Sequence, residues 1–145
     1  MLTAYTDGAV RVSNPGVASC AWVMYNGKGE HLHSESYYLG PELRSNNYAE
    51  YAGLIHLLEW LYEHQTRNVV IHSDSALVVN QVNQKWDVNS DELRPLMSKA
   101  YGLLVQGAHV LKHCKGHAGN IGNEKADRLC NEELDKRKNY ESSKN

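Results

Sequence analysis

The sequence contains no phenylalanine, only three prolines, and no long uninterrupted run of apolar residues. A membrane-spanning helix needs roughly 18 consecutive apolar residues, and no segment approaches that length. A strand-like segment follows Met1 almost at once, and no pattern typical of a secretory leader precedes it. The sequence therefore predicts a protein of the cytoplasm that does not associate with membranes.

Cysteine is also scarce, and its three examples are Cys20, Cys114 and Cys130. An odd number of cysteines without a Cys-x-x-Cys pair argues against a disulfide framework and favours a reducing compartment. The segment HCKGH places His113, Cys114 and His117 close together. A structural zinc site needs a second closely spaced ligand pair, and Cys130 stands alone. We therefore favour small buried thiols over a zinc site.

The chain has 145 residues, of which 41% are hydrophobic, and this suffices for one domain with a sizeable core. We predict a single domain over residues 1–138 and a disordered tail over residues 139–145. The formal net charge of −2 by itself disfavours nucleic acid as a partner. Residues 111–138, however, carry seven basic and five acidic side chains, so the distribution of charge matters more than its sum.

Hydrophobic periodicity predicts an ordered series of strands and helices. Apolar residues in segment 47–64 recur at spacings of three and four, which is typical of an amphipathic helix. The pair Asn26–Gly27 between two strand-like segments indicates a β-hairpin. The predicted strands are 1–6, 18–25, 30–39, 68–73 and 108–113, and the predicted helices are 47–64, one beginning near Ser75, 91–106 and 123–138. A hairpin meander followed by alternating strands and helices predicts an α/β protein with a mixed sheet.

Four carboxylates occupy notable places in this series. Asp7 follows the first predicted strand, Glu50 lies in the first turn of a helix, and Asp74 lies between a strand and a helix. Asp127 lies on the last helix, ten residues after the loop residue His117. Each has a simpler explanation: a turn at Asp7, a capping box that includes Glu50, an N-cap at Asp74, and a solvated charge at Asp127. The histidine is either a surface residue or a proton carrier near neutral pH.

Taken together, the four carboxylates predict one acidic cluster. The carboxyl ends of central strands form the usual active-site rim of such a sheet, and Asp7 and Asp74 both follow strands. Carboxylates that pack closely need a multivalent cation to balance their repulsion. Oxygen ligands favour Mg²⁺ or Mn²⁺, and such sites commonly act on phosphate esters. Two divalent cations would turn the negative net charge into a positive one, which is compatible with a phosphate backbone.

Four segments, in this order, resemble the type 1 ribonuclease H family: TDGA with NPG downstream, NNYAEY, HSDSALVV and KGHAGNIGNEKAD. The resemblance covers roughly residues 1–134. It implies a ribonuclease H-like fold, with a mixed five-stranded sheet of antiparallel and parallel strands and helices on both faces. It also implies hydrolysis of the RNA strand of RNA–DNA hybrids by a two-metal-ion mechanism, which leaves 5′-phosphate and 3′-hydroxyl ends. We expect two Mg²⁺ ions, with Mn²⁺ as a substitute, and a monomeric protein.

The resemblance also assigns roles to residues. His117 matches a loop histidine that assists proton transfer or product release. Trp86 either stacks on a DNA sugar or anchors a helix junction. Side-chain amides suit recognition of RNA because the 2′-hydroxyl is both a donor and an acceptor, and recognition of backbone and shape does not select a sequence. The implied metal-binding and catalytic carboxylates are Asp7, Glu50, Asp74 and Asp127, and the implied contacts with the hybrid are Asn14, Ser45, Asn46 and Asn47.

Three departures from the family pattern bear on how tightly the chain is expected to bind its substrate. The loop from Asp7 to Asn14 is one residue longer than in the common bacterial form, and Ala76 stands where many members carry a polar residue. No lysine or arginine cluster follows Trp86, so the basic protrusion of some members is absent, and we expect a handle-less form with weaker, salt-sensitive substrate binding.

Several alternatives differ in substrate or activity. Double-stranded RNA is an alternative substrate, because some handle-less members accept it. A non-catalytic hybrid-binding module on the same fold would bind the hybrid without metal-dependent cleavage. A DNA-only nuclease, such as a junction resolvase or a transposase core, is disfavoured by the pair Asn46–Asn47, which indicates recognition of RNA.

Overall fold

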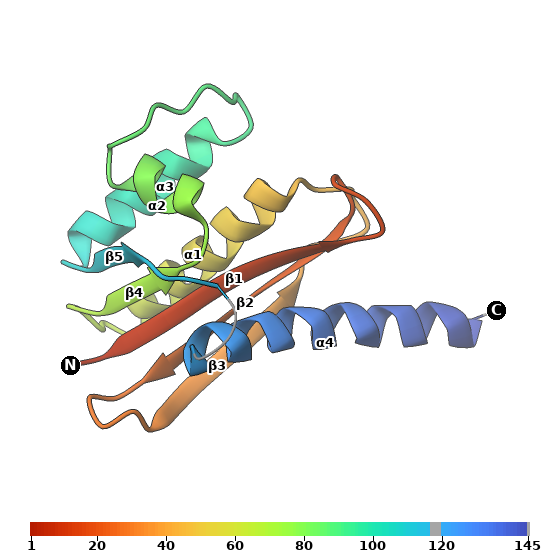
Figure 1. Ribbon diagram of the computed structural model, residues 1–145, viewed down its shortest axis with the longest axis horizontal. Coiled ribbons are helices and arrows are strands. Elements are labelled where there is room, and N and C mark those ends of the chain that lie inside the picture. Colours follow the sequence, from red (N-terminus) through yellow and green to blue (C-terminus); the bar gives the residue numbers. More distant parts are fainter. Residues whose placement is uncertain (117–119, 145) are drawn as a thin grey trace.

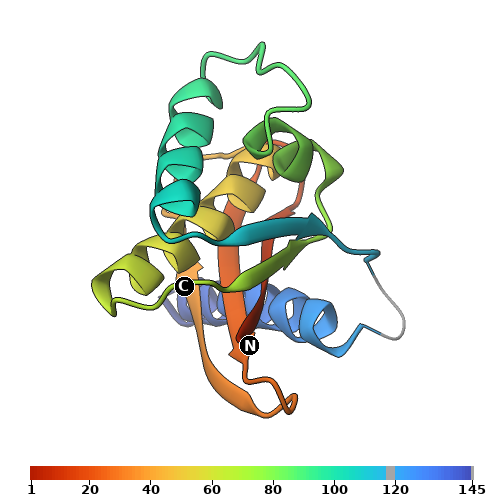
Figure 2. The same cartoon turned by 90° about the vertical axis from the view of Figure 1, so that its left-hand side faces the viewer.

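The computed structural model describes residues 1–116 and 120–144, with side chains described up to Arg137. A single sheet lies between two layers of helices (Figures 1 and 2). Within the described part of the chain, no helix is both long enough and apolar enough to cross a membrane. In chain order the elements are β1 (Thr3–Arg11), β2 (Val17–Tyr25), β3 (His31–Tyr38), α1 (Asn46–Glu63), β4 (Val70–Ser73), α2 (Ala76–Val82), α3 (Arg94–Gln106), β5 (Val110–His113) and α4 (Ile121–Lys144).

The sheet has five strands in the order β3-β2-β1-β4-β5. The first three strands form an antiparallel meander, whereas β4 and β5 pair in parallel with β1 and with each other. Helices α1, α2 and α3 lie on one face, and α4 crosses the other face (Figure 2). The predicted mixed sheet with helices on both faces is therefore confirmed. Strand β1 is the central strand, and it pairs antiparallel with β2 on one side and parallel with β4 on the other.

The core lies between α1 and the sheet. Tyr51, Leu54 and Leu58 lie on the apolar face of α1 that the sequence predicted, and they are buried in one cluster with Trp22 and Ile71. Burial of a side chain of this size stabilises the fold by roughly 1.5–3 kcal/mol. This packing fixes α1 across β1 and β2, and the position of α1 in turn fixes the position of Glu50.

Two boundaries differ from the sequence prediction in ways that affect the site. Strand β1 does not end at Asp7: Asp7 and Gly8 lie inside it, paired with Ala21 and Cys20 of β2. The predicted strand end and the alternative of a turn are therefore both wrong. Helix α1 begins at Asn46, and its N-cap is Ser45, so Glu50 is not the acid of a capping box that begins at Asn47.

The later helices show similar differences. The N-cap of α2 is Ser75, whose Oγ accepts a hydrogen bond from the amide of Val78 at 3.2 Å, so Asp74 is not a cap. Helix α3 begins at Arg94 rather than at residue 91, with a proline in its first turn as predicted. Helix α4 begins at Ile121 and continues to Lys144, past the end that the sequence predicted.

The connection between α2 and α3 covers residues 83–93, all of which the structure describes. It contains turns but no helix, and Lys85 is its only basic side chain. This agrees with the handle-less form, because no additional helix projects from the domain at this point.

Candidate active site

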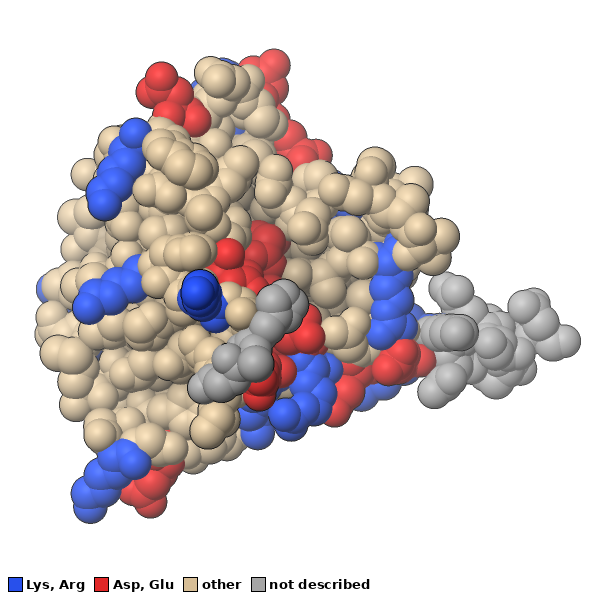
Figure 3. Space-filling view, in the orientation of Figure 1, with Lys and Arg blue, Asp and Glu red and all other residues tan. Residues whose placement is uncertain are grey.

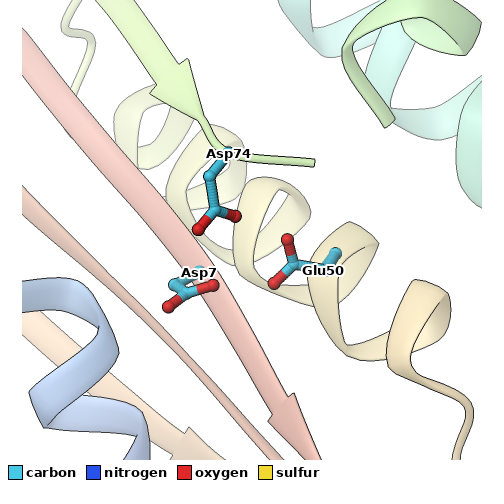
Figure 4. A group of neighbouring side chains, drawn as sticks. All are labelled: Asp7, Glu50 and Asp74. Carbon is cyan, nitrogen blue, oxygen red and sulfur yellow. The ribbon is translucent and has the colours of Figure 1, made fainter. Parts of the chain in front are cut away.

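Three carboxylates from three different elements meet beside the central strand. Asp7 lies on β1, Glu50 lies on α1, and Asp74 directly follows β4. One carboxylate oxygen of each lies within 4.8 Å of one oxygen of the other two. The three side chains point toward one another (Figure 4), and acidic side chains gather near the centre of this face of the molecule (Figure 3). The predicted acidic cluster thus exists for these three residues.

Strand register explains why Asp7 and Asp74 are neighbours. The parallel pairing of β1 with β4 places Thr6 opposite Ser73. The residue that follows each of these is an aspartate, so both carboxylates emerge at the same level of the sheet. Asp74 can turn toward Asp7 because β4 ends at Ser73, whereas β1 continues.

Two glycines bring Glu50 to the same place. A Cβ atom on Gly8 would lie 2.2 Å from the carbonyl carbon of Ala49, and one on Gly53 would lie 2.5 Å from the carbonyl oxygen of Asp7. Helix α1 and strand β1 therefore touch through their backbones, which any larger residue at either position would prevent. At this contact the amide of Gly8 donates to Asp7 Oδ1 at 2.9 Å and also to Glu50 Oε1.

The environment of the cluster opposes its negative charge. Asp7 is 6% exposed and Glu50 is 7% exposed. Burial, followed by the charges of Asp74 and Asp127, raises the pKa of Asp7 from 3.8 to about 7, although hydrogen bonds from Glu50 and Gly8 oppose the shift. Burial and then the charge of Asp7 raise the pKa of Glu50 well above its usual value.

Among the described residues, no lysine or arginine forms an ion pair with this cluster of Asp7, Glu50 and Asp74. Compensation of the cluster's negative charge must therefore come from protons or from a cation in solution. Clustered carboxylate oxygens without a protein cation fit Mg²⁺ or Mn²⁺, which prefer oxygen ligands.

The other two predicted catalytic residues, Asp127 and His117, are not part of this group of three carboxylates. Asp127 is exposed on α4, outside the set of oxygens within 4.8 Å, yet it is near enough for its charge to raise the pKa of Asp7. His117 lies outside the described residues, so its predicted role stays a prediction. The structure therefore brings three of the four carboxylates into direct proximity and places the fourth at the margin of the site.

Two residues at the site were not singled out in the sequence. Asn123, in the first turn of α4, is 3% exposed, and its Nδ2 donates to Asp74 Oδ2 at 3.2 Å. A Cβ on Gly116 would lie 3.0 Å from the same Asp74 oxygen, so the segment after β5 passes close over this carboxylate. The spacing of Asn123 and Asp127 by four residues was a usable signal, because such residues share one face of a helix.

The thiols agree with the expectation of buried cysteines. Cys20 and Cys130 are buried, Cys114 is partly buried, and all three are free. Burial, and then the charges of Asp74 and Asp7, raise the pKa of Cys114 to about 11, so this thiol stays protonated at neutral pH. Among the described residues, the three carboxylates form the only group with suitable metal-ligand geometry, and no cysteine belongs to it.

The predicted substrate contacts lie around the beginning of α1. Asn14 Oδ1 accepts from the amide of Asn46 at 2.9 Å, which ties the β1–β2 loop to this helix. Ser45 Oγ accepts from Tyr48 and donates to Glu92, both at 3.1 Å. Asn14 and Ser45 therefore have structural roles.

The remaining predicted contacts are open to solvent. The side chains of Asn46 and Asn47 are exposed at the start of α1. Trp86 lies on the α2–α3 connection and is 52% exposed, so half of its indole is available to a partner. Whether these five positions bind substrate stays a prediction.

Comparisons with known proteins agree with this arrangement. The family model for RNase H matches residues 1–135. Ribonuclease HI of Halobacterium salinarum is 36% identical over 132 residues, which cover 91% of this chain but 63% of that protein. Ribonuclease H of Methylobacillus flagellatus is 32% identical over 143 residues, which cover 90% of this chain and 89% of that protein.

Solved structures show the same likeness. RNase H1 from Halobacterium salinarum superimposes with a TM-score of 0.82 at 34% identity, covering 93% of this chain and 98% of that one. LC11-RNase H1, solved in complex with an RNA/DNA hybrid, has a TM-score of 0.82 at 31% identity, covering 94% and 99% of the two chains. The match over nearly the whole domain, together with the carboxylate cluster, shows that the chain belongs to the RNase H family, in its handle-less form.

Proposed function

We propose that the chain is an endoribonuclease that hydrolyses the RNA strand of RNA–DNA hybrids and leaves 5′-phosphate and 3′-hydroxyl ends. The observation that carries the proposal is the convergence of three carboxylates from β1, α1 and the end of β4, with oxygens within 4.8 Å of one another. Structural packing alone would not favour this arrangement, since it raises the pKa of two buried acids.

Asp7, Glu50, Asp74 and Asp127 are the residues that would hold two divalent cations, Mg²⁺ or in its place Mn²⁺. When bound, such ions supply an activated water and stabilise the charge that develops on the leaving 3′-oxygen. The protein's own contribution begins before binding. In the absence of a cation, burial raises the pKa of Asp7 to about 7 and the pKa of Glu50 well above its usual value, so a cation that binds here competes with protons for these carboxylates.

The second contribution is orientation of the substrate. Asn46 and Asn47 expose side-chain amides at the start of the helix that carries Glu50, so contacts with the hybrid would be positioned by the same rigid element as the catalytic acid. An amide both donates and accepts, and it therefore matches the 2′-hydroxyl that distinguishes RNA from DNA. Asn14 and Ser45 act at the same end of α1, and Trp86 offers a ring for stacking on a sugar.

Proton transfer is the third contribution. We assign to His117 the removal or delivery of a proton at the scissile phosphate, or assistance in product release, because an imidazole titrates near neutral pH. The chain acts as a monomer on the hybrid. The complex of the related LC11-RNase H1 with an RNA/DNA hybrid supports this choice of substrate over double-stranded DNA.

The test uses three duplexes of one sequence, an RNA–DNA hybrid, double-stranded RNA and double-stranded DNA, each labelled on one strand and incubated first with Mg²⁺ and then with Mn²⁺. We expect cleavage of the RNA strand of the hybrid, and no cleavage by the Asp74→Asn variant, whose fold is retained. Cleavage of DNA alone, or tight binding of the hybrid without cleavage, would overturn the proposal. Cleavage of double-stranded RNA would extend the substrate range to that of the dual-specificity alternative.

A further inference from the structure

The beginning of α4 contacts the acidic cluster through one buried amide. The side chain of Asn123 is 3% exposed, and its Nδ2 lies 3.2 Å from Asp74 Oδ2. An ionised carboxylate can only accept hydrogen bonds, so the amide nitrogen is the group that faces it. A buried neutral donor aimed at an acid stabilises the charged form of that acid without neutralising it.

The backbone around Asn123 is fixed by close contacts. Asn120 caps α4: its Oδ1 accepts from the amide of Asn123 at 3.0 Å, and its carbonyl accepts from the amide of Glu124 at 2.9 Å. Gly122 lies directly on the ring of Tyr5, since a Cβ there would be 2.1 Å from Cδ1. The first turn of α4 therefore cannot shift freely relative to β1, and the Asn123 amide has a defined direction.

We infer that Asn123 is a positioning residue for the metal site: it orients Asp74 and seats the helix that carries Asp127. The inference rests on the proposed function, because it assigns this role to a residue that acts through the proposed metal ligands. By donating to Oδ2 of Asp74, the amide fixes the rotation of a carboxylate that has an oxygen within 4.8 Å of Asp7 and Glu50. Hydrogen bonds of this kind fix the orientation of a ligand before the cation arrives.

The same residue links Asp74 to the fourth carboxylate. Asn123 and Asp127 are four residues apart on α4, so both project from the side of the helix that faces the cluster. The charge of Asp127 already reaches Asp7, although its oxygens are outside the group of three. The hydrogen bond from Asn123 to Asp74 therefore also fixes the position of Asp127 relative to the cluster. Loss of this hydrogen bond should weaken cation binding more than it weakens substrate binding.

The experiment measures Mg²⁺ binding to the metal-free protein by isothermal titration calorimetry, without substrate, for wild type, Asn123→Ala and Asn123→Leu. The leucine variant restores side-chain volume without a donor, and alanine is well tolerated in a helix. We expect both variants to bind Mg²⁺ roughly 10- to 100-fold more weakly. In hybrid cleavage, the half-saturating Mg²⁺ concentration should rise by a similar factor, while KM for the hybrid at saturating Mg²⁺ stays unchanged.

Asn83→Ala is the matched control. Asn83 also donates its amide to another element, to the carbonyl of Leu111 at 3.0 Å, but it has no contact with the cluster. It should lower thermal stability and leave the Mg²⁺ affinity at the wild-type value. If Asn123→Leu bound Mg²⁺ as wild type does while wild type cleaved hybrid, the inference alone would fail. A wild-type protein that neither bound Mg²⁺ nor cleaved hybrid would overturn the proposed function as well.

Discussion

Replacement of Asp7 by asparagine should make the metal-free protein more stable. Asparagine has nearly the same shape, and its Oδ1 can keep the hydrogen bond from the Gly8 amide at 2.9 Å. In the wild type, burial and the neighbouring acids raise the pKa of Asp7 from 3.8 to about 7. At 1.36 kcal/mol for each pKa unit, deprotonation of Asp7 in the folded state costs about 4 kcal/mol relative to the unfolded chain.

The sign of this effect fixes its dependence on pH. A raised pKa means that the folded protein keeps a proton that the unfolded chain has lost. The stabilisation from protonated Asp7 is therefore complete below about pH 4 and is lost as the pH rises to about 7. The asparagine of the Asp7→Asn variant does not titrate, so the variant should match wild type near pH 4 and exceed it by roughly 2–4 kcal/mol at pH 8, where Glu50 is also relieved of its neighbour's charge.

The assay is urea unfolding in EDTA at pH 4, 6 and 8, repeated at pH 8 with saturating Mg²⁺. Excess Mg²⁺ should stabilise wild type, by about 2.7 kcal/mol at 100 times the dissociation constant, and Asp7→Asn much less. Asp87→Asn, an exposed aspartate on the α2–α3 connection, is the control and should change stability by under about 0.5 kcal/mol at every pH. Equal stability of Asp7→Asn and wild type at pH 8, or a difference that persists at pH 4, would refute the electrostatic reasoning.

Three other changes test separate parts of the site. Gly53→Ala should destabilise the fold by roughly 1–3 kcal/mol and lower kcat, because the added Cβ must push α1 away from the carbonyl of Asp7. Chemical unfolding measures the stability and steady-state kinetics measures kcat. Wild-type values of both would show that the close backbone contact is not required. His117→Ala should reduce kcat with little change in KM, and an unchanged rate would make this histidine a bystander. If the chain binds the hybrid as proposed, activity at subsaturating hybrid, measured as kcat/KM, should fall steeply between about 50 and 200 mM salt, because salt weakens the attraction between a protein and a phosphate backbone.

The order of elements could be predicted from the sequence because each element leaves local signals, whereas the proximity of Asp7, Glu50 and Asp74 was inferred only from the four acids taken together. The spacing of Tyr51, Leu54 and Leu58 identifies the buried face of α1 without reference to any other element. The Asn26–Gly27 pair predicted the β2–β3 hairpin, whose turn closes through a bond from the amide of Gly29 to the carbonyl of Asn26 at 3.0 Å. These features depend on neighbours within a few residues, so periodicity and turn chemistry suffice to find them.

The parts that sequence reasoning missed depend on contacts between distant segments. The Asp7–Gly8 pair looks like a turn, but Gly8 lies inside a strand because the backbone of Ala49 occupies the space of its missing side chain. Nothing in the residues around Gly53 indicates that it faces Asp7, and the spacing of Asn123 from Asp127 places the two on one helix face without showing that Asn123 contacts Asp74. Such roles become visible only when the register of β1 with β4 and the crossing of the helices are known.

The glycines and the acids together explain why this site is held at a cost in stability. Gly53 in the middle of α1 lowers helix stability by about 1 kcal/mol relative to alanine, and the paired burial of Asp7 and Glu50 opposes folding at neutral pH. Neither the glycine in α1 nor the two buried acids improve the packing of the core. What both allow is the close approach of the Asp7 and Glu50 carboxylates. A cation that binds the folded state alone reverses the electrostatic part of this cost. Stability in Mg²⁺ and stability in EDTA should therefore diverge as the pH rises, and that divergence should be much smaller in Asp7→Asn.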